Sequence, residues 1–421
     1  MKPNRRVFVL GGDHTTFLGK NHPDFIWKRH PDFGKRDNPT LDEHLESAIR
    51  LALAATGLDP ARIQKGYVGN FAGELFVQQG HLGALVSRVV PELEGVPFAR
   101  VEGACASGAL AVVGCLEAIQ AGYDVTLAVG AEVQTSVSAR EGAAFLARAA
   151  HFATESGYDD FTFPAMFARR AKAYKAATGA TDEEIAHVTV KAYGNGNRNP
   201  KAHMSAVKMT LEQAAYPSDS NPCFLRNEEV RDHLKMSDCS QVSDGGSAMF
   251  LVSEEGLRSL GLTPEDAIEI IGYGQATSAL GRVADDTRLN NTQRAAEEAY
   301  ASAGLAARDM EIAEVHDCFA VTEVLMAEAL GFAPYGQGAA LAREGRSALT
   351  GDIPINTGGG LLAFGHPVGA TGVKQVLEIA RQMRGQCGDY QVQRTLRHGI
   401  SANMGGDDRT SVCVILRNNA V

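Results

Sequence analysis

Two stretches with the same layout decide the fold: Ala48–Asn70, AIRLALAATGLDPARIQKGYVGN, and Ala295–Asp317, AAEEAYASAGLAARDMEIAEVHD. Each reads as an alanine-rich helix that stops at Gly-Leu, followed by a turn and a short strand. The offset between the two copies is 247 positions, both at the glycines and at the strand valines. An apolar stretch also precedes each helix, at 7–10 and 268–271. We predict a duplicated α/β fold, although an alanine-rich helix with a Gly-Leu stop is also a common phrase in α/β proteins.

Length and composition set the broad class of the protein. The chain has 421 residues, 44% of them hydrophobic and 21% charged, which is typical of a globular protein of two to three domains. We divide it into an N-terminal half, 1–265, and a C-terminal half, 266–421. The formal net charge of −10 argues against a nucleic-acid partner. No apolar run is long enough for a membrane span, and without a leader or targeting signal we expect a cytoplasmic protein.

Two regions do not fit the repeat. Residues from about 133 to 240 predict a loop domain inserted into the first half. Residues 13–38 predict a polar loop outside the core, which reaches either a ligand or a neighbouring subunit. Several histidines lie in polar stretches and are expected to be solvated, namely His22, His30, His44 and His203.

Cys105 is the first candidate for chemistry. The seven cysteines include no Cys-x-x-Cys pair, so reduced thiols are expected and a zinc ribbon is not. Cys105 lies in Gly103-Ala104-Cys105-Ala106-Ser107-Gly108, between a strand at 98–101 and an apolar helix from Ser107 to Gln120. The N-terminus of a helix stabilises a thiolate, so Cys105 is a candidate nucleophile. An inert core cysteine is the alternative.

Two histidines differ from the rest. His366 stands between Gly365 and Pro367 in a glycine-rich segment and could serve as the base for a cysteine, or simply cap a turn. His316 precedes Asp317 and Cys318 at the end of the second repeat's strand, where α/β proteins place their sites. Metal binding there is disfavoured because no further Cys or His ligand follows within four residues. Cys318 next to Phe319 suits a proton donor better than a nucleophile.

The last candidate segment runs from Ser401 to Asp408. Its glycine N–H groups could hold an oxyanion, and a β-hairpin turn would explain the same residues equally well.

Together these segments resemble the thiolase superfamily, and most closely its sterol-carrier-protein-type thiolases. The resemblance covers nearly the whole chain and rests on four stretches in order: Gly103–Gly108, His316-Asp317-Cys318-Phe319, Gly365–Gly372 and Asn403-Met404-Gly405. It implies two βαβαβαββ halves that form a five-layered αβαβα sandwich with an inserted loop domain. It also implies acyl transfer between thioesters of coenzyme A, as cleavage of a 3-oxoacyl thioester or the reverse condensation.

The resemblance also implies residue roles. Cys105 would take the acyl group and His366 its proton, while Cys318 would exchange a proton with the second substrate. His316 and His366 would form one oxyanion hole, and the N–H groups of Cys105 and Gly405 the other. Substrate contacts are implied for Met166 and Asn403.

The resemblance further implies coenzyme A and its acyl thioesters as partners, no tightly bound cofactor or metal, and a homodimer or homotetramer. Asp407-Asp408 departs from the family pattern, because two carboxylates beside an oxyanion hole would oppose its charge unless they face solvent or serve another purpose. A condensing enzyme, a steroid side-chain aldolase and a non-catalytic acyl-binding scaffold therefore stay open as alternatives.

Overall fold

A mixed β-sheet runs through the whole protein, and the computed structural model describes residues 4–421 of it. Within those residues the sheet has nine strands in the order β3-β2-β4-β5-β1-β6-β9-β8-β7. The strands are β1 (Val7–His14), β2 (Lys65–Gly69), β3 (Phe98–Val101), β4 (Val125–Glu132), β5 (Gly245–Ser253), β6 (Ile268–Thr277), β7 (Ile312–Val315), β8 (His398–Gly405) and β9 (Thr410–Asn418).

The duplication predicted from the sequence is confirmed. The two alanine-rich helices are α1 (Leu41–Thr56) and α11 (Asn290–Ala303), and both end at a glycine in the left-handed region, Gly57 and Gly304. The strand that follows each helix runs parallel to its neighbour, β2 to β4 and β7 to β8. The order β2-β4-β5-β1 in the first half-sheet is repeated in reverse as β6-β9-β8-β7 in the second. The two half-sheets join where β1 pairs antiparallel with β6 over only three positions.

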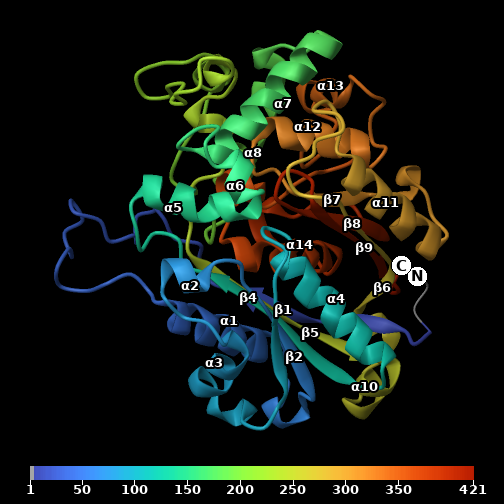
Figure 1. Cartoon of the computed structure of the whole chain (residues 1–421). Coiled ribbons are helices and arrows are strands. Elements are labelled where there is room, and N and C mark those ends of the chain that lie inside the picture. The colour runs from blue at the N-terminus through green and yellow to red at the C-terminus, as the bar shows by residue number, and fades with distance from the viewer. Residues whose placement is uncertain (1–3) are drawn as a thin grey trace.

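Helices cover both faces of each half-sheet and complete the predicted five layers (Figure 1). The middle layer is α4 (Ser107–Gln120) packed against α14 (Val368–Met383), which contacts strands of both halves. The outer layers include α1 with α3 (Leu82–Val89) on one side and α11 with α12 (Ala320–Ala329) on the other. Separate apolar clusters fill the spaces between layers. Short helices α2 (Gly73–Phe76) and α10 (Glu254–Ser259) complete the N-terminal half.

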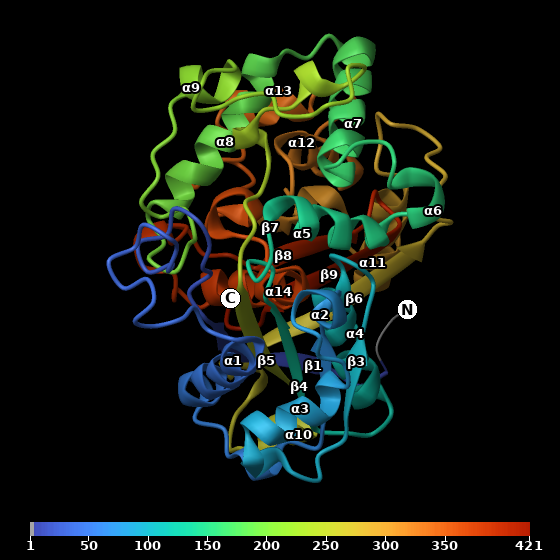
Figure 2. The ribbon, with the colours of Figure 1, turned by 60° about the vertical axis from the view of Figure 1, so that its left-hand side comes forward.

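The inserted region lies between β4 and β5 and is largely helical. It contains α5 (Ala139–Leu146), α6 (Phe152–Glu155), α7 (Thr162–Thr178), α8 (Asp182–Gly196) and α9 (Leu211–Ala215). These helices gather over the C-terminal half-sheet beside α12 and α13 (Gly338–Arg343), as Figure 2 shows. The sequence-based boundary at 265/266 falls just before β6 and stays a prediction.

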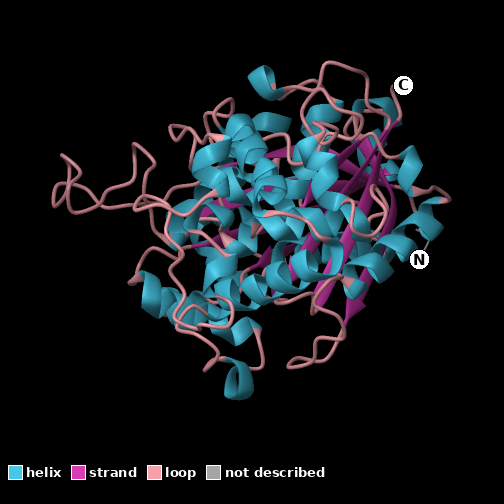
Figure 3. Cartoon of the chain, turned by 90° about the horizontal axis from the view of Figure 1, so that it is seen from above, coloured by secondary structure: helices cyan, strands magenta, loops and turns pink. Residues whose placement is uncertain are grey.

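Part of the loop 13–38 is core, contrary to expectation. Phe17 is fully buried and packs edge-on against Phe364. Leu18, Phe25 and Ile26 are buried as well. Other residues of the segment, among them Trp27 and Phe33, are exposed on the long loop that leaves the body on the left in Figures 1 and 3. Whether it meets a ligand or another subunit remains a prediction.

Three of the four histidines expected in solvent are also buried: His22, His44 and His203. Local partners explain His203, because its ring nitrogens bond to Ser243 Oγ and to the Lys20 carbonyl. No helix among residues 4–421 combines the length and the apolar character that crossing a bilayer requires.

Candidate active site

Cys105 occupies a strained turn between β3 and α4. The residue before it, Ala104, has φ 52°, a left-handed conformation that a non-glycine residue adopts at a cost. The Cys105 sulfur accepts hydrogen bonds from its own backbone N–H and from that of Gly406. Burial outweighs both and raises the pKa of the thiol to about 12. The two N–H contacts lower the pKa of Cys105 but do not offset burial, so the resting thiol keeps its proton and a nucleophilic role would need a base.

His366 is held in the form that such a base requires. It follows the π-helical turn Gly360–Phe364 and precedes α14. Its Nδ1 lies 2.7 Å from Thr371 Oγ1, and that hydroxyl donates its own proton to the Pro367 carbonyl. Nδ1 must therefore carry the ring proton and donate it to Thr371. Nε2 is left with a free lone pair, and it is buried with no hydrogen-bond partner among the described residues.

His316 has the opposite tautomer. It stands directly after β7 and faces Asn403 on the neighbouring strand β8. The Asn403 amide Nδ2 donates to His316 Nδ1 over 3.0 Å, so the ring proton is on Nε2. Burial lowers the pKa of both imidazoles, that of His366 to about 3, so both are neutral. One ring presents an acceptor and the other a donor.

The three groups converge although they come from distant parts of the chain. Sγ of Cys105 and one ring nitrogen from each of His316 and His366 all lie within 4.8 Å of one another. The two rings meet edge to face with their centroids 5.0 Å apart. Cys318 faces the same cavity, with its sulfur 3.8 Å from Thr322 Oγ1. Burial and the neighbouring Cys105 raise the pKa of the Cys318 thiol well above its usual range, which keeps it protonated.

The cavity that these side chains share has a volume of about 160 Å³ and a mainly apolar wall. Aromatic residues from the loop domain and α12's N-terminal flank form much of it: Phe161, Phe163, Phe167 and Phe319. The small residues of α5 and the turn that follows it form another part: Ala139, Ala143 and Ala149. The wall is suited to contact with an apolar chain. The two thiols and the two imidazoles lie at one end of the cavity.

The remaining residues named from the sequence are placed as follows. Met166 is fully buried in α7 and does not line the cavity, whereas its neighbours Pro164 and Phe167 do. Asn403 is buried and touches His316 rather than the cavity wall. Gly405 ends β8, and the N–H that reaches the Cys105 sulfur belongs to the next residue, Gly406.

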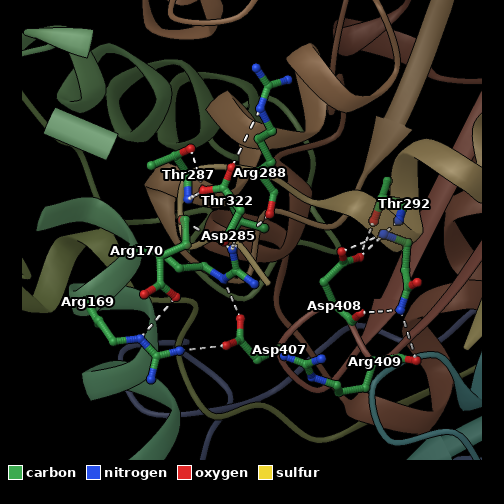
Figure 4. A network of polar contacts seen from close by, with 12 residues as sticks. Arg169, Arg170, Asp285, Thr287, Arg288, Thr292, Thr322, Asp407, Asp408 and Arg409 are labelled. Atoms are coloured by element: carbon green, nitrogen blue, oxygen red, sulfur yellow. Dashed lines mark hydrogen bonds and ion pairs between the residues drawn. The ribbon is translucent and has the colours of Figure 1, made fainter. Parts of the chain in front are cut away.

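Asp407 and Asp408 are buried and held by partners rather than facing solvent (Figure 4). The Asp407 carboxylate is paired with the guanidinium groups of Arg169 and Arg170. The Asp408 carboxylate accepts the backbone N–H groups of Asn291 and Thr292 in the first turn of α11. Asp407 is thus paired with cations and Asp408 is satisfied by hydrogen bonds, and the turn fixes the backbone around Gly406. Of the two explanations for Asp407-Asp408, solvent exposure or another purpose, the contacts support the second, and that purpose is to hold the turn in place.

Comparisons with known proteins give the family. The description "Thiolase, N-terminal domain" matches residues 32–255, and "Thiolase C-terminal domain-like" matches residues 272–418. The chain is 35% identical over 361 residues to an acetyl-CoA acetyltransferase of Methanothermobacter thermautotrophicus, covering 86% of this chain and 90% of that protein. The chain belongs to the thiolase family.

Other relatives span more of this thiolase. It is 29% identical over 412 residues to the benzoylsuccinyl-CoA thiolase subunit BbsB of Thauera aromatica, with 97% of each chain covered. It is 28% identical over 417 residues to sterol carrier protein 2 of Gallus gallus, covering 96% of this chain and 70% of that protein. The resemblance seen in the sequence is confirmed, and the protein is an acyltransferase enzyme of thiolase type.

Solved structures share the fold. The Ltp2-ChsH2(DUF35) aldolase superposes with a TM-score of 0.75 at 22% identity, covering 100% of this chain and 99% of that one. Human mitochondrial 3-ketoacyl-CoA thiolase superposes with a TM-score of 0.69 at 17% identity, covering 99% of each. The thiolase fold class predicted from the sequence is confirmed.

Sequence reasoning missed the residues that orient the thiolase site. Thr371 lies one turn into α14, five residues after His366, and only its contact shows that it sets the tautomer. Ser243 accepts the backbone N–H of His366, and its position just before Asp244-Gly245-Gly246 gave no signal of that contact. The contact of the Gly406 N–H with the Cys105 sulfur was not foreseen, because the exact end of a strand is hard to read from a sequence. The oxyanion-hole role expected for Gly405 stays a prediction.

Cys105, His316 and His366 are also spaced so that they could hold a metal ion. Thiolate and imidazole are ligands that zinc accepts. The absence of a resident metal, expected from the sequence, stays a prediction.

Proposed function

We propose that this thiolase transfers acyl groups between thioesters of coenzyme A in two stages, through an acyl group carried on Cys105. One observation supports the proposal above all: the free Nε2 lone pair of His366 and the protonated Cys105 sulfur belong to one cluster less than 5 Å across. A half-buried thiol with a raised pKa, such as Cys105, reacts only if a base stands beside it.

In the first stage, Cys105 Sγ attacks the thioester carbonyl while His366 Nε2 takes the thiol proton. The carbonyl oxygen becomes an anion, which the N–H groups of Cys105 and Gly406 hold. We assign Gly406 to the place first given to Gly405. The intermediate then collapses to the acyl-cysteine, and the departing sulfur takes the proton from His366. Each such backbone donor typically lowers a barrier by about 3–4 kcal/mol.

In the second stage, Cys318 exchanges a proton with the second substrate. In cleavage this stage comes first: Cys105 Sγ adds to the 3-oxo carbon while His366 takes the thiol proton, the bond between carbons 2 and 3 breaks to leave the acyl-cysteine, and Cys318 protonates the carbanion that leaves. The thiol of free coenzyme A then takes the acyl group and returns a proton to Cys105. In condensation, Cys318 removes a proton from the acetyl donor, and the resulting carbanion attacks the acyl-cysteine and releases Cys105, which takes up that proton. The enolate oxygen is held by His316 Nε2–H, for which Asn403 has fixed the tautomer. The raised pKa keeps the Cys318 thiol protonated at rest, which suits the donation of a proton to the carbanion in cleavage.

The apolar wall of the cavity supports a substrate with an apolar acyl group larger than acetyl. The names of the relatives refer to thioesters of different size, from acetyl to benzoylsuccinyl. We therefore infer the size of the acyl group from the cavity wall and not from the relatives. We further propose a role in lipid metabolism in the cytoplasm, coenzyme A as substrate and product, and a homodimer or homotetramer. Because one relative is named as a subunit, a hetero-complex is the alternative assembly, and light scattering on the purified chain distinguishes the two.

The alternatives are not favoured. Both thiols are present and face one cavity, which an aldolase or an acyl-binding scaffold does not require. The aldolase neighbour shares the fold at 22% identity and no more follows from it.

Acyl-coenzyme A with a labelled acyl chain tests the proposal. The label should become covalently attached to Cys105 and return to free coenzyme A when it is added. The Cys105→Ser variant should not be labelled, and Cys318→Ala should be labelled but should not complete cleavage or condensation. Absence of label from wild-type Cys105, or normal turnover by Cys318→Ala, would contradict the assigned roles.

A further inference from the structure

A second cavity lies on the other side of the turn that carries Asp407 and Asp408. It is an open cleft of about 570 Å³ between the segment 278–288, the first residues of α11 and the turn Asp407–Arg409. The acyl cavity is about 160 Å³ and almost wholly apolar, whereas five arginines and three aspartates line this cleft. In a chain with a formal net charge of −10, that is a concentrated positive site.

The three aspartates of the cleft already have partners. Asp407 is paired with Arg169 and Arg170, and Asp408 accepts N–H groups at the start of α11 (Figure 4). Asp285 accepts both the N–H and the hydroxyl of Thr287. The three carboxylates therefore interact with groups of the cleft wall and hold those groups in place.

Three of the arginines have no carboxylate partner. Arg282 and Arg294 are exposed, and their guanidinium groups make no recorded ion pair or hydrogen bond with any residue between 4 and 421. Arg409 donates only to Ser278 Oγ and the Ala279 carbonyl. Arg288, by contrast, stacks on Tyr335 and lies 3.7 Å from Asp285. Three guanidinium groups with unused donors thus face one space.

The floor of the cleft is rigid. Arg170 is 2% exposed, and its Nη1 donates to the carbonyls of Asp285, Asp286 and Arg288. Asn291 ties the Asp408 carbonyl to Ser278 Oγ. A site whose walls are held in this way loses little entropy when a ligand binds.

The cleft is separate from the catalytic cavity. Among the described residues none lines both, and the backbone from Gly406 to Asp407 divides them. An acyl group on Cys105 and a ligand on the arginines would therefore occupy different spaces.

We propose that this cleft is a second binding site, for a small molecule carrying two or more phosphate or carboxylate groups. Arg282, Arg294 and Arg409 bind the anionic groups, because guanidinium forms charge-assisted, often bidentate hydrogen bonds with both. Ser278 and Asn290 supply uncharged partners at the edge. The bound anion lies next to the turn that positions Gly406, and it is independent of the acyl group on Cys105.

Calorimetric titration of the whole protein with pyrophosphate tests the proposal. Parallel titrations use tricarballylate and coenzyme A. Pyrophosphate tests for binding of phosphate groups, tricarballylate for binding of carboxylate groups, and coenzyme A for binding of the substrate's own nucleotide. We expect saturable binding of pyrophosphate or tricarballylate that weakens as ionic strength rises. The double variant Arg282→Ser/Arg294→Ser should bind at least about tenfold more weakly, with unchanged acyl labelling of Cys105. The matched control is Arg258→Ser on α10, an exposed arginine outside the cleft, which should bind as the wild type does.

Three results would overturn the proposal. They are absence of binding by either small anion, equal binding by the double variant, and competition between pyrophosphate and an acyl thioester for one site. If coenzyme A alone binds and the double variant loses it, the arginines serve the substrate rather than a second ligand, and the claim of a separate site fails. None of these outcomes depends on whether Cys105 carries an acyl group.

Discussion

At the scale of single residues, the two active-site histidines show how one side-chain type takes two roles. Both rings are neutral because burial lowers the pKa of each. The Thr371 hydroxyl accepts the Nδ1 proton of His366 and leaves Nε2 as an acceptor, and the Asn403 amide donates to Nδ1 of His316 and leaves Nε2 as a donor. In the proposed mechanism these two nitrogens face Cys105 and the substrate. The chemistry is therefore assigned by Thr371 and Asn403, neither of which touches the reacting atoms.

Replacing Thr371 with Val tests the first of these contacts. The variant removes the acceptor of the His366 Nδ1 proton at nearly constant volume, so the ring can rotate or change tautomer. We expect the rate of Cys105 acylation to fall by about 10- to 100-fold, part of the range that a general base contributes. Thr371→Ser is the control and should retain most of the rate, because it keeps the hydroxyl. Rapid-quench labelling measures both, and an unchanged rate in Thr371→Val would remove Thr371 from the mechanism.

The pH dependence of acylation follows from the same environment. An ordinary histidine base loses its activity below its pKa near 6.5, because protonation fills its lone pair. Burial lowers the pKa of His366 to about 3 and raises that of Cys105 to about 12, so the reactive neutral pair persists between those values. We expect the labelling rate to be flat from pH 5 to pH 8 in single-turnover experiments. An acid limb with an apparent pKa of 6–7 would show that His366 is not the base, or that it is not buried during the reaction.

The four chemical side chains could be found from the sequence because each stands in a short glycine-rich or strand-end motif. Their orientation could not. Thr371 and Asn403 act through contacts between segments that are distant in sequence or around a helical turn. The sequence could not decide between the two interpretations of Asp407, because its partners, Arg169 and Arg170, lie more than 200 positions away. Met166 is buried in α7 away from the cavity wall, because neighbouring residues of one helix point in different directions, and its substrate contact stays a prediction.

At the scale of elements, the strands and helices of the repeat could be predicted from period and turn chemistry, whereas the inserted helices were read only in outline. The strand pairing of β1 with β6 and the π-helical turn before His366 had no local signal. The polar composition of 13–38 hid the fact that Phe17 inserts into the core beside Phe364. The average composition of a loop does not reveal that a single side chain, here Phe17, is buried.

Helix α5 carries the prediction that belongs to this scale. Ala143 lines the cavity, while its neighbour Ala144 is exposed on the other face of the helix. Ala143→Phe should fill the acyl end and lower kcat/KM for an octanoyl-length substrate by about tenfold or more relative to the shortest substrate, since added bulk rejects a longer chain. Ala144→Phe is the matched control and should leave the ratio unchanged. An equal loss for short and long substrates would mean that α5 lines the common thioester path instead of the acyl end.

At the scale of the whole molecule, the site exists only because the two halves are held at close range. Cys105 belongs to the first half, and His316, Cys318 and His366 to the second. The halves meet through α4 and α14, where backbone packs on backbone. A Cβ added at Gly108 would lie 2.7 Å from the Gly369 carbonyl oxygen and 2.8 Å from the Gly372 nitrogen. Both of these atoms are main chain, so neither can move without moving its helix.

Gly108→Ala should therefore push α14 away from α4 and separate His366 from Cys105. Overpacking of this kind costs about 1–3 kcal/mol of unfolding free energy, and a displacement of about 1 Å at a reacting pair can cost about 100-fold in rate. We expect a lower melting temperature together with acylation slowed by about 10- to 100-fold. Gly194→Ala in α8 is the control, because nothing lies within 4 Å of its added methyl group and alanine favours a helix. If Gly108→Ala loses stability but acylates at the wild-type rate, the distance between the halves does not set the chemistry, and each half positions its own residues independently.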